Sequence, residues 1–146
     1  MIEIRKVQKN EISAVYDLIV ELAIYEKEPD AVTAKLEDYN TSFENGLIDV
    51  YVAVANENIV GMALYYMTFS TWKGKMLYLE DFYVREEYRS KGTGQELFDA
   101  FIKEAKDQGC SMVKWQVLDW NEKAIKFYER NKATIEKQWY NGKIIF

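Results

Sequence analysis

The chain has 146 residues, of which 49% are hydrophobic and 15% aromatic, with one cysteine and no histidine. This composition excludes a Ser-His-Asp triad, a Cys-His pair, an internal disulfide and the usual zinc sites, so we expect no bound metal. The 19 basic and 24 acidic side chains give a formal net charge of −5, which argues against a nucleic-acid partner and favours cationic ones.

Hydrophobic periodicity switches between the strand and the helix pattern along the chain. We expect a strand at 2–7, a helix that is capped by Asn10 and ends near Glu26, and a weaker helix at 33–44. Three strands follow at 48–55, 59–69 and 75–84. A second strong helix at 93–108 precedes a strand at 112–117, which is too apolar for the edge of a sheet.

The last part of the chain predicts a short helix and a hairpin. Asn121 is expected to cap the helix, which ends near Arg130, and Asn141-Gly142 to turn a hairpin of strands 134–140 and 143–146. The order βααβββαβαββ predicts an α/β (α+β) fold, a mixed, mostly antiparallel twisted sheet of about seven strands with helices on both faces. At this length, residues 1–146 are expected to form a single domain.

The start of the sequence, MIEIRKV, has no signal-peptide hydrophobic region, and no apolar run reaches the ~20 residues of a membrane span. A lone cysteine is typical of a reducing compartment. We therefore expect a cytoplasmic protein that has no membrane partner.

A glycine-rich turn, Arg89-Ser90-Lys91-Gly92-Thr93-Gly94, joins a strand to the long helix. Backbone N–H groups at such a helix N-terminus can bind an anion. Leu97 stands where a dinucleotide-binding fingerprint needs glycine, and the P-loop pattern is missing. Thr93 followed by Glu96 also fits a capping box, so an anion site and an ordinary helix start are both possible interpretations.

Glu80 lies in the strand before this turn. Alternation places it on one face with Tyr78, Phe82 and Val84, in a strand that we interpret as central in the sheet. A carboxylate there is costly unless it is paired, hydrated or used in chemistry. It is either one half of a buried ion pair or a general base, a role that falls to a carboxylate in a chain without histidine.

These residues, in this order, resemble the GNAT family of acyl-CoA-dependent N-acetyltransferases, and within it the diamine (spermidine/spermine) acetyltransferase branch. The likeness covers nearly the whole chain and is carried by Arg89, Gly92 and Gly94 and by residues 22–26, 65–75, 77–84 and 119–121. It implies acetyl-CoA as co-substrate, a small cationic amine as the other substrate, and a homodimer.

The resemblance also implies the site residues. Backbone amides of the glycine turn hold the pyrophosphate of acetyl-CoA, and the preceding strand pairs with its pantetheine arm. The implied cofactor-binding residues are Phe82, Tyr83, Val84, Arg89, Ser90, Lys91, Gly92, Thr93, Gly94, Gln95, Asn121, Lys123 and Ala124. The implied amine-binding residues are Tyr25, Glu26, Trp72, Glu80, Asp81, Lys114, Trp115 and Gln116.

Tyr128 matches the family's tyrosine that protonates the departing thiolate. By its spacing alone the alternative is a core tyrosine, and sheet packing is the alternative for Trp72.

Within the branch, two subtypes compete. The polyamine enzymes carry an acidic residue and proline where this chain has Ser70-Thr71, whereas Ser-Thr-Trp-Lys-Gly and Val-Leu-Asp-Trp-Asn resemble the thialysine N-epsilon-acetyltransferase type. One departure stands out. Lys132 occupies a position where the family pattern has glycine, so the helix before it ends either on a strained lysine or on Asn131.

The sequence thus predicts an acetyl-CoA-dependent N-acetyltransferase in which the amine attacks directly in a ternary complex. Glu80 accepts the ammonium proton and Tyr128 protonates the leaving sulfur. Two alternatives stay open: a protein or peptide N-acetyltransferase, and a non-catalytic acyl-CoA-binding module.

Overall fold

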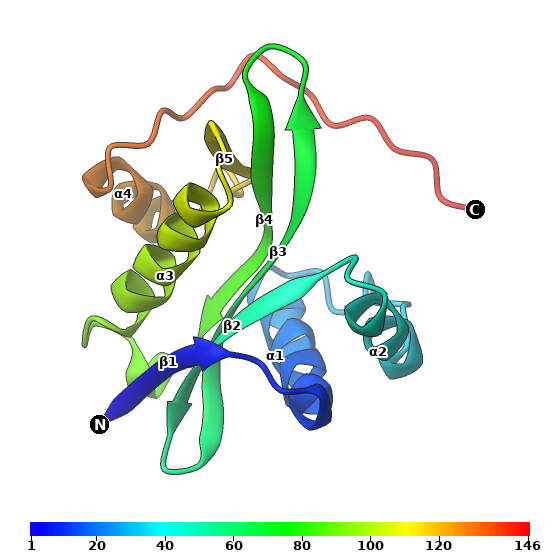
Figure 1. Cartoon of the computed structure of the whole chain (residues 1–146), viewed down its shortest axis with the longest axis vertical. Helices are drawn as coiled ribbons and strands as arrows, with labels where there is room; N and C mark the ends of the chain where they lie inside the picture. Colours follow the sequence, from blue (N-terminus) through cyan, green and yellow to red (C-terminus); the bar gives the residue numbers. More distant parts are fainter. The chain divides into compact units, whose positions relative to one another are not determined.

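The computed structural model describes residues 1–146, which divide into two compact units, Met1–Gln116 and Val117–Phe146. Each unit is described by itself. The first contains β1 (Ile2–Lys6), α1 (Ile12–Tyr25), α2 (Leu36–Glu44), β2 (Asp49–Ala55), β3 (Asn58–Ser70), β4 (Gly74–Val84), α3 (Thr93–Asp107) and β5 (Met112–Trp115), with 3-10 turns at Lys9–Glu11 and Glu86–Tyr88 (Figure 1). The second contains α4 (Glu122–Arg130).

The strands of the first unit form one sheet in the order β1-β2-β3-β4-β5. The pairs from β1 to β4 are antiparallel, and β5 runs parallel to β4. Helices α1 and α2 lie on one side of the sheet and α3 on the other (Figure 1). The expected α/β class with a mixed sheet and helices on both faces is confirmed.

The sheet has five strands instead of about seven, so the expected strand order is not confirmed. Residues 131–146 form neither helix nor strand, and the expected strands 134–140 and 143–146 are absent. An isolated hairpin is marginally stable unless it packs on a further strand or helix. In this segment Trp139, Tyr140 and Ile144 remain exposed.

β5 is an edge strand, so the expectation that residues 112–117 lie away from an edge is wrong. The strand can be apolar at an edge because α3 covers one of its faces. The Trp115 ring meets the Phe98 ring of α3 edge-on, with centroids 5.5 Å apart.

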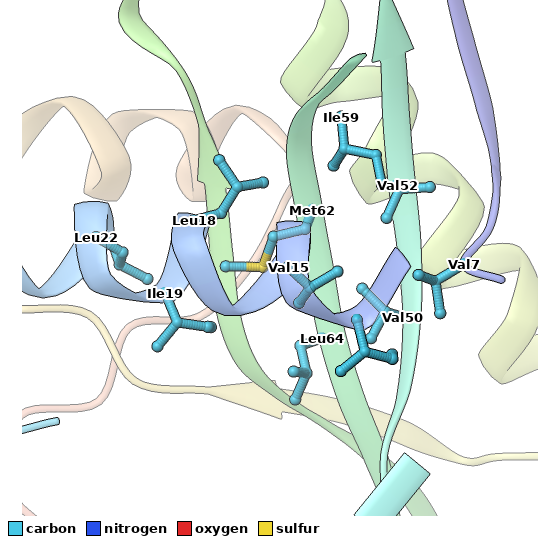
Figure 2. Packing of buried hydrophobic residues seen from close by; sticks show 11 residues of the cluster. Val7, Val15, Leu18, Ile19, Leu22, Val50, Val52, Ile59, Met62 and Leu64 are labelled. Carbon is cyan, nitrogen blue, oxygen red and sulfur yellow. The ribbon is translucent and has the colours of Figure 1, made fainter. Parts of the chain in front are cut away.

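The core beneath α1 follows from its helical periodicity, which brings the apolar residues of that helix onto one face. They pack against the apolar side chains that β2 and β3 present to the same side (Figure 2). The cluster comprises Val7, Ile12, Val15, Leu18, Ile19, Leu22, Val50, Val52, Ile59, Met62 and Leu64.

On the opposite face, α3 approaches β3 closely at Gly61. A Cβ atom at this position would lie 3.2 Å from Leu97 Cδ1, from the Tyr83 carbonyl oxygen and from Val84 Cγ2. The missing side chain therefore lets Leu97 reach the sheet, where it is fully buried.

The helix ends test three further expectations. Asn10 does not cap α1, because Lys9–Glu11 forms a 3-10 turn in which the Glu11 carboxylate accepts the Gln8 N–H at 2.8 Å. Asn121 does cap α4, and its side chain accepts the Ala124 N–H at 3.3 Å. After α4, the left-handed residue is Lys132, with a φ of +65°, and not Asn131. The expected alternative of a strained lysine is therefore the one that the structure has.

None of the helices combines the length and the apolar character that crossing a membrane requires.

Candidate functional site

A β-bulge in β4 decides which way its carboxylates face. Leu79 lies opposite Tyr65 of β3 and Asp81 opposite Leu64, so Glu80 is an extra residue in the ladder. Because Tyr65 and Leu64 are successive residues, Leu79 and Asp81 lie on opposite faces although they are two residues apart. Leu64 belongs to the cluster beneath α1, so Asp81 faces the α1 side.

Glu80 lies on this same face. Its carboxylate accepts a hydrogen bond from the Tyr66 hydroxyl at 2.7 Å, and Tyr66 stands opposite Tyr78 with stacked rings 5.5 Å apart. Glu80 is exposed and forms no ion pair, so the interpretation as one half of a buried ion pair is wrong.

Phe82 and Val84 lie on the other face, where Phe82 contacts Phe98 and Val84 packs with Leu97. The expectation that Glu80 shares a face with these two residues is wrong, because the bulge resets the alternation between them.

Three carboxylates, those of Glu26, Glu80 and Asp81, gather at the α1 face. Burial, together with the charges of Glu80 and Glu26, raises the pKa of Asp81 to about 7. Burial also raises the pKa of Glu26. A bound cation would oppose both effects, since it offsets the desolvation of the carboxylates and their mutual repulsion. The site is therefore suited to an ammonium group.

Two tyrosines with no expected role in a site also belong to this face. Tyr66 donates to Glu80, as described above. Burial, with the nearby Asp81 charge, raises the pKa of Tyr39 in α2 to about 12. Cross-strand pairing with Tyr78 could have suggested Tyr66, whereas nothing in the sequence around Tyr39 marks it.

The sheet opens next to these carboxylates. β5 follows β4 only from Met76 to Leu79, and beyond Leu79 the sheet has no strand beside β4 on that side. The segment from Phe82 to Val84, expected to pair with a pantetheine arm, lies in this diverging part of β4. Its cofactor role stays a prediction.

The N-terminus of α3 has the features of an anion site. Gly92 precedes the helix with a left-handed φ of +85°, and no side chain caps the helix. Thr93 is the first residue of the helix and not its cap, so the interpretation of Thr93 and Glu96 as a capping box is wrong. Its hydroxyl is buried, with the residue 1% exposed, and has no hydrogen-bond partner. A buried orphan donor beside the positive end of a helix favours an anionic ligand.

The other residues of the glycine turn surround this N-terminus. There is space beside Gly94, since a Cβ there would meet only Phe82, at 3.8 Å. Gln95 donates to Asp99 at 2.8 Å, and the Lys91 ammonium lies 6.0 Å from the Tyr88 ring centroid. Ser90 has a left-handed φ of +60°.

Arg89 turns toward β4 and α1. Its Nε donates to the Val84 carbonyl at 2.6 Å, and its guanidinium carbon lies 5.1 Å from the ring centroid of Tyr25 and 5.3 Å from that of Tyr83. Tyr25, assigned by resemblance to the amine site, is thus in contact with the glycine turn.

The remaining amine-site candidates of the first unit are divided between faces. Lys114 stands opposite Tyr78 and so faces the carboxylates, whereas Trp115 faces α3. Gln116 follows the end of β5 and is exposed. Trp72 is 82% exposed in the turn between β3 and β4, and the seven residues from Gly74 to Glu80 span about 20 Å of strand. The structure does not bring Trp72 to the carboxylates.

The candidates of the second unit lie on α4. Lys123 and Ala124 are in its first turn after the Asn121 cap. Tyr128 follows seven residues after the cap, and its ring meets that of Phe127 with centroids 5.5 Å apart. The acid role of Tyr128 stays a prediction.

The chain matches the family model described as Acetyltransferase (GNAT) family over residues 12–132. It is 37% identical over 136 residues to thialysine N-epsilon-acetyltransferase of Bos taurus, which covers 86% of this chain and 80% of the relative. It is 31% identical over 150 residues to spermidine/spermine N(1)-acetyltransferase-like protein 1 of Homo sapiens, covering 94% of this chain and 22% of that protein.

The fold is also found among solved structures. An aminoglycoside acetyltransferase from an uncultured soil metagenomic sample superimposes with a TM-score of 0.83 at 20% sequence identity, over 99% of this chain and 96% of the other. At this identity the likeness shows a shared fold and nothing about a shared substrate.

Proposed function

The chain belongs to the GNAT family of acetyltransferases, and from this we propose that it transfers the acetyl group of acetyl-CoA to the primary amine of a small cation. The observation that carries the choice of substrate is the group of three carboxylates at the α1 face. An ammonium bound beside Glu26, Glu80 and Asp81 lowers their repulsion, and the neighbouring tyrosine rings add an attractive surface for a cation.

The N-terminus of α3 fits the pyrophosphate of acetyl-CoA. Its first backbone N–H groups have no partner within the helix and follow a left-handed glycine, and the buried Thr93 hydroxyl has no hydrogen-bond partner. Residues Phe82, Tyr83 and Val84, Arg89 to Gln95, and Asn121, Lys123 and Ala124 are proposed to hold the cofactor. Acetyl-CoA supplies an activated acetyl thioester.

The chain's own groups then handle the protons. Glu80, with Asp81 beside it, accepts a proton from the ammonium, so that the amine nitrogen gains the lone pair that attacks the carbonyl carbon. A main-chain N–H of β4 donates to the carbonyl oxygen as negative charge develops on it. As the C–N bond forms and the C–S bond breaks, Tyr128 gives its proton to the sulfur. The role of Tyr128 rests on its position in the motif Asn-Glu-Lys-Ala-Ile-Lys-Phe-Tyr.

Among cationic amines we propose a thialysine-like amino acid over a long polyamine. The relatives named thialysine N-epsilon-acetyltransferase support this choice, and so does Ser70, where the polyamine subtype has a carboxylate. The Ser70 hydroxyl accepts the Lys73 N–H at 3.1 Å and so helps to close the hairpin turn. It offers no charge to a distal ammonium. A homodimer in the cytoplasm stays a prediction.

The proposal is tested by measuring free thiol release from acetyl-CoA in the presence of thialysine, spermidine, putrescine, lysine or a basic peptide. We expect the highest kcat/KM with thialysine. A preference for spermidine would reassign the substrate to polyamines, and a preference for the peptide would favour a protein acetyltransferase. Tight CoA binding without thiol release for any amine would indicate a binding module.

Tyr128→Phe tests the acid role separately. The variant is expected to bind CoA with unchanged affinity in calorimetry and to lower kcat by at least tenfold. Unchanged turnover would remove Tyr128 from the mechanism.

A further inference from the structure

Arg89 is held by two elements at once. Its Nε donates to the Val84 carbonyl at the end of β4, and its guanidinium lies over the Tyr83 ring of the same strand and over the Tyr25 ring at the end of α1. No other hydrogen bond or ion pair of its guanidinium occurs within the structure. The turn that leads to Gly92 is therefore fixed at its beginning by a main-chain carbonyl and two aromatic rings.

The rings that contact Arg89 are themselves anchored. The Tyr83 hydroxyl donates to Glu21 of α1 at 3.4 Å, and Arg85 binds the same Glu21 carboxylate through Nε at 3.1 Å and Nη2 at 2.7 Å. Tyr25 lies one helical turn beyond Glu21 on α1. The last turns of α1 are thereby tied by an ion pair to Arg85, the residue that follows β4, and Tyr25 lies where it meets Arg89.

Tyr25 is also the neighbour of Glu26 in the chain. Glu26 lies close enough to Asp81 for its charge to act on that carboxyl, whereas Tyr25 reaches Arg89. Of these two successive residues at the end of one helix, Glu26 belongs to the carboxylate group and Tyr25 contacts the glycine turn.

From these contacts we propose that Tyr25 is a positioning residue for the glycine turn: its ring holds Arg89, and so sets the affinity for acetyl-CoA, in addition to any contact with the amine. The proposal rests on the function proposed above, because it takes the glycine turn as the cofactor site. The relevant property of Tyr25 is the face of its ring, since a cation over an aromatic ring is attracted by the ring's quadrupole.

Calorimetry with CoA and no amine tests the proposal in the full-length protein. We expect Tyr25→Leu, which keeps an apolar side chain but lacks an aromatic face, to weaken CoA binding by about two- to fivefold, the range that one partly exposed cation–π contact supports. Tyr25→Phe keeps the face and should stay within about 1.5-fold of the unmodified protein. Ile24→Ala is the matched control, because Ile24 is the preceding residue and is 59% exposed.

Steady-state kinetics separate positioning from chemistry. Tyr25→Leu should raise KM for acetyl-CoA by a larger factor than it lowers kcat, with Tyr25→Phe restoring KM. Equal CoA affinity of Tyr25→Leu and the unmodified protein would overturn the inference, as would an equal loss in Tyr25→Phe. If the unmodified protein bound no CoA, the proposed function itself would be wrong. A second replacement, Tyr25→Met, gives the same comparison if Tyr25→Leu does not fold.

Discussion

Glu80 and Asp81 are successive residues of β4, yet both present their carboxylates to the α1 face of the sheet. A regular strand would point them to opposite faces, where their charges would be separated by the backbone. The bulge brings the two charges together and leaves the more buried one, Asp81, without an ion pair. As a result, the pKa of Asp81 is raised.

The Asp81 carboxyl should make the stability of the protein depend on pH. Its pKa is raised from 3.8 to about 7 by burial first and then by the charges of Glu80 and Glu26. Between these pH values the folded protein holds a proton that the unfolded chain has lost, so the free energy of unfolding falls as pH rises from about 4 to about 7. Above pH 7 the ionised Asp81 carboxylate lowers the free energy of unfolding by a constant amount.

Asp81→Asn should remove this dependence and raise the free energy of unfolding at pH 8 by about 1–3 kcal/mol. Urea unfolding at pH 5 and pH 8 measures the difference. Asp30→Asn is the control, because Asp30 is exposed in the turn after α1. A difference between pH 5 and pH 8 that is the same in Asp81→Asn and in the unmodified protein would contradict the assignment.

Glu80→Gln tests the proton acceptor. The change keeps the size of the side chain and its contact with the Tyr66 hydroxyl but removes the basic carboxylate, so kcat/KM should fall by about 10²- to 10⁴-fold. Tyr66→Phe is the companion variant, since it removes the hydrogen bond and leaves the carboxylate. Its loss should be smaller than that of Glu80→Gln. The measurement is the pH–rate profile, and a profile unchanged by Glu80→Gln would exclude Glu80 as the base.

Gly61→Ala should destabilise the first unit. The added methyl group would lie 3.2 Å from Leu97, from Val84 and from the Tyr83 carbonyl, and α3 cannot move away without exposing its buried face. We expect a loss of about 1–3 kcal/mol in the free energy of unfolding. Gly142→Ala serves as control because nothing lies within 4 Å of a Cβ there. Equal stability of the two variants would show that α3 does not pack this closely on β3.

Lys132→Gly should stabilise the end of α4. Lys132 has a φ of +65°, a conformation that costs a residue with a Cβ about 1 kcal/mol relative to glycine. Thermal unfolding of Lys132→Gly should therefore show a higher Tm. Lys132→Ala separates the backbone effect from the loss of the lysine charge, because alanine keeps the Cβ and should give no gain.

Most of the fold was predictable because the signals are local. The apolar periodicity of α1 and α3 and the Asn121 cap are each contained within a few turns of chain, and the structure has them where they were expected. The closing hairpin was predicted wrongly. The Asn141-Gly142 turn is a local signal, but a hairpin is stable only if it has a further surface to pack on. Nothing in the sequence of that segment shows whether such a surface is present.

The bulge has a signal that simple alternation overlooked. The residues facing α3 are Leu77 and Leu79 before the bulge and Phe82 and Val84 after it, so the apolar positions change from odd to even numbers at Glu80. One extra residue in a strand produces such a change, because every later side chain then points to the opposite face. The position of Tyr39, by contrast, depends on how α2 packs in three dimensions and could not have been read from its neighbours in sequence.

The unpaired hydroxyl of Thr93 lowers the stability of the free protein, but it can donate a hydrogen bond to an anion at the start of α3. A buried hydroxyl without a partner costs about 1–3 kcal/mol, and valine has nearly the same shape without that cost. Replacement by valine should therefore make the free protein more heat-resistant and, at the same time, take a hydrogen bond from an anion bound at the start of α3. Selection for thermal stability alone would remove Thr93, whereas selection for ligand binding would retain it.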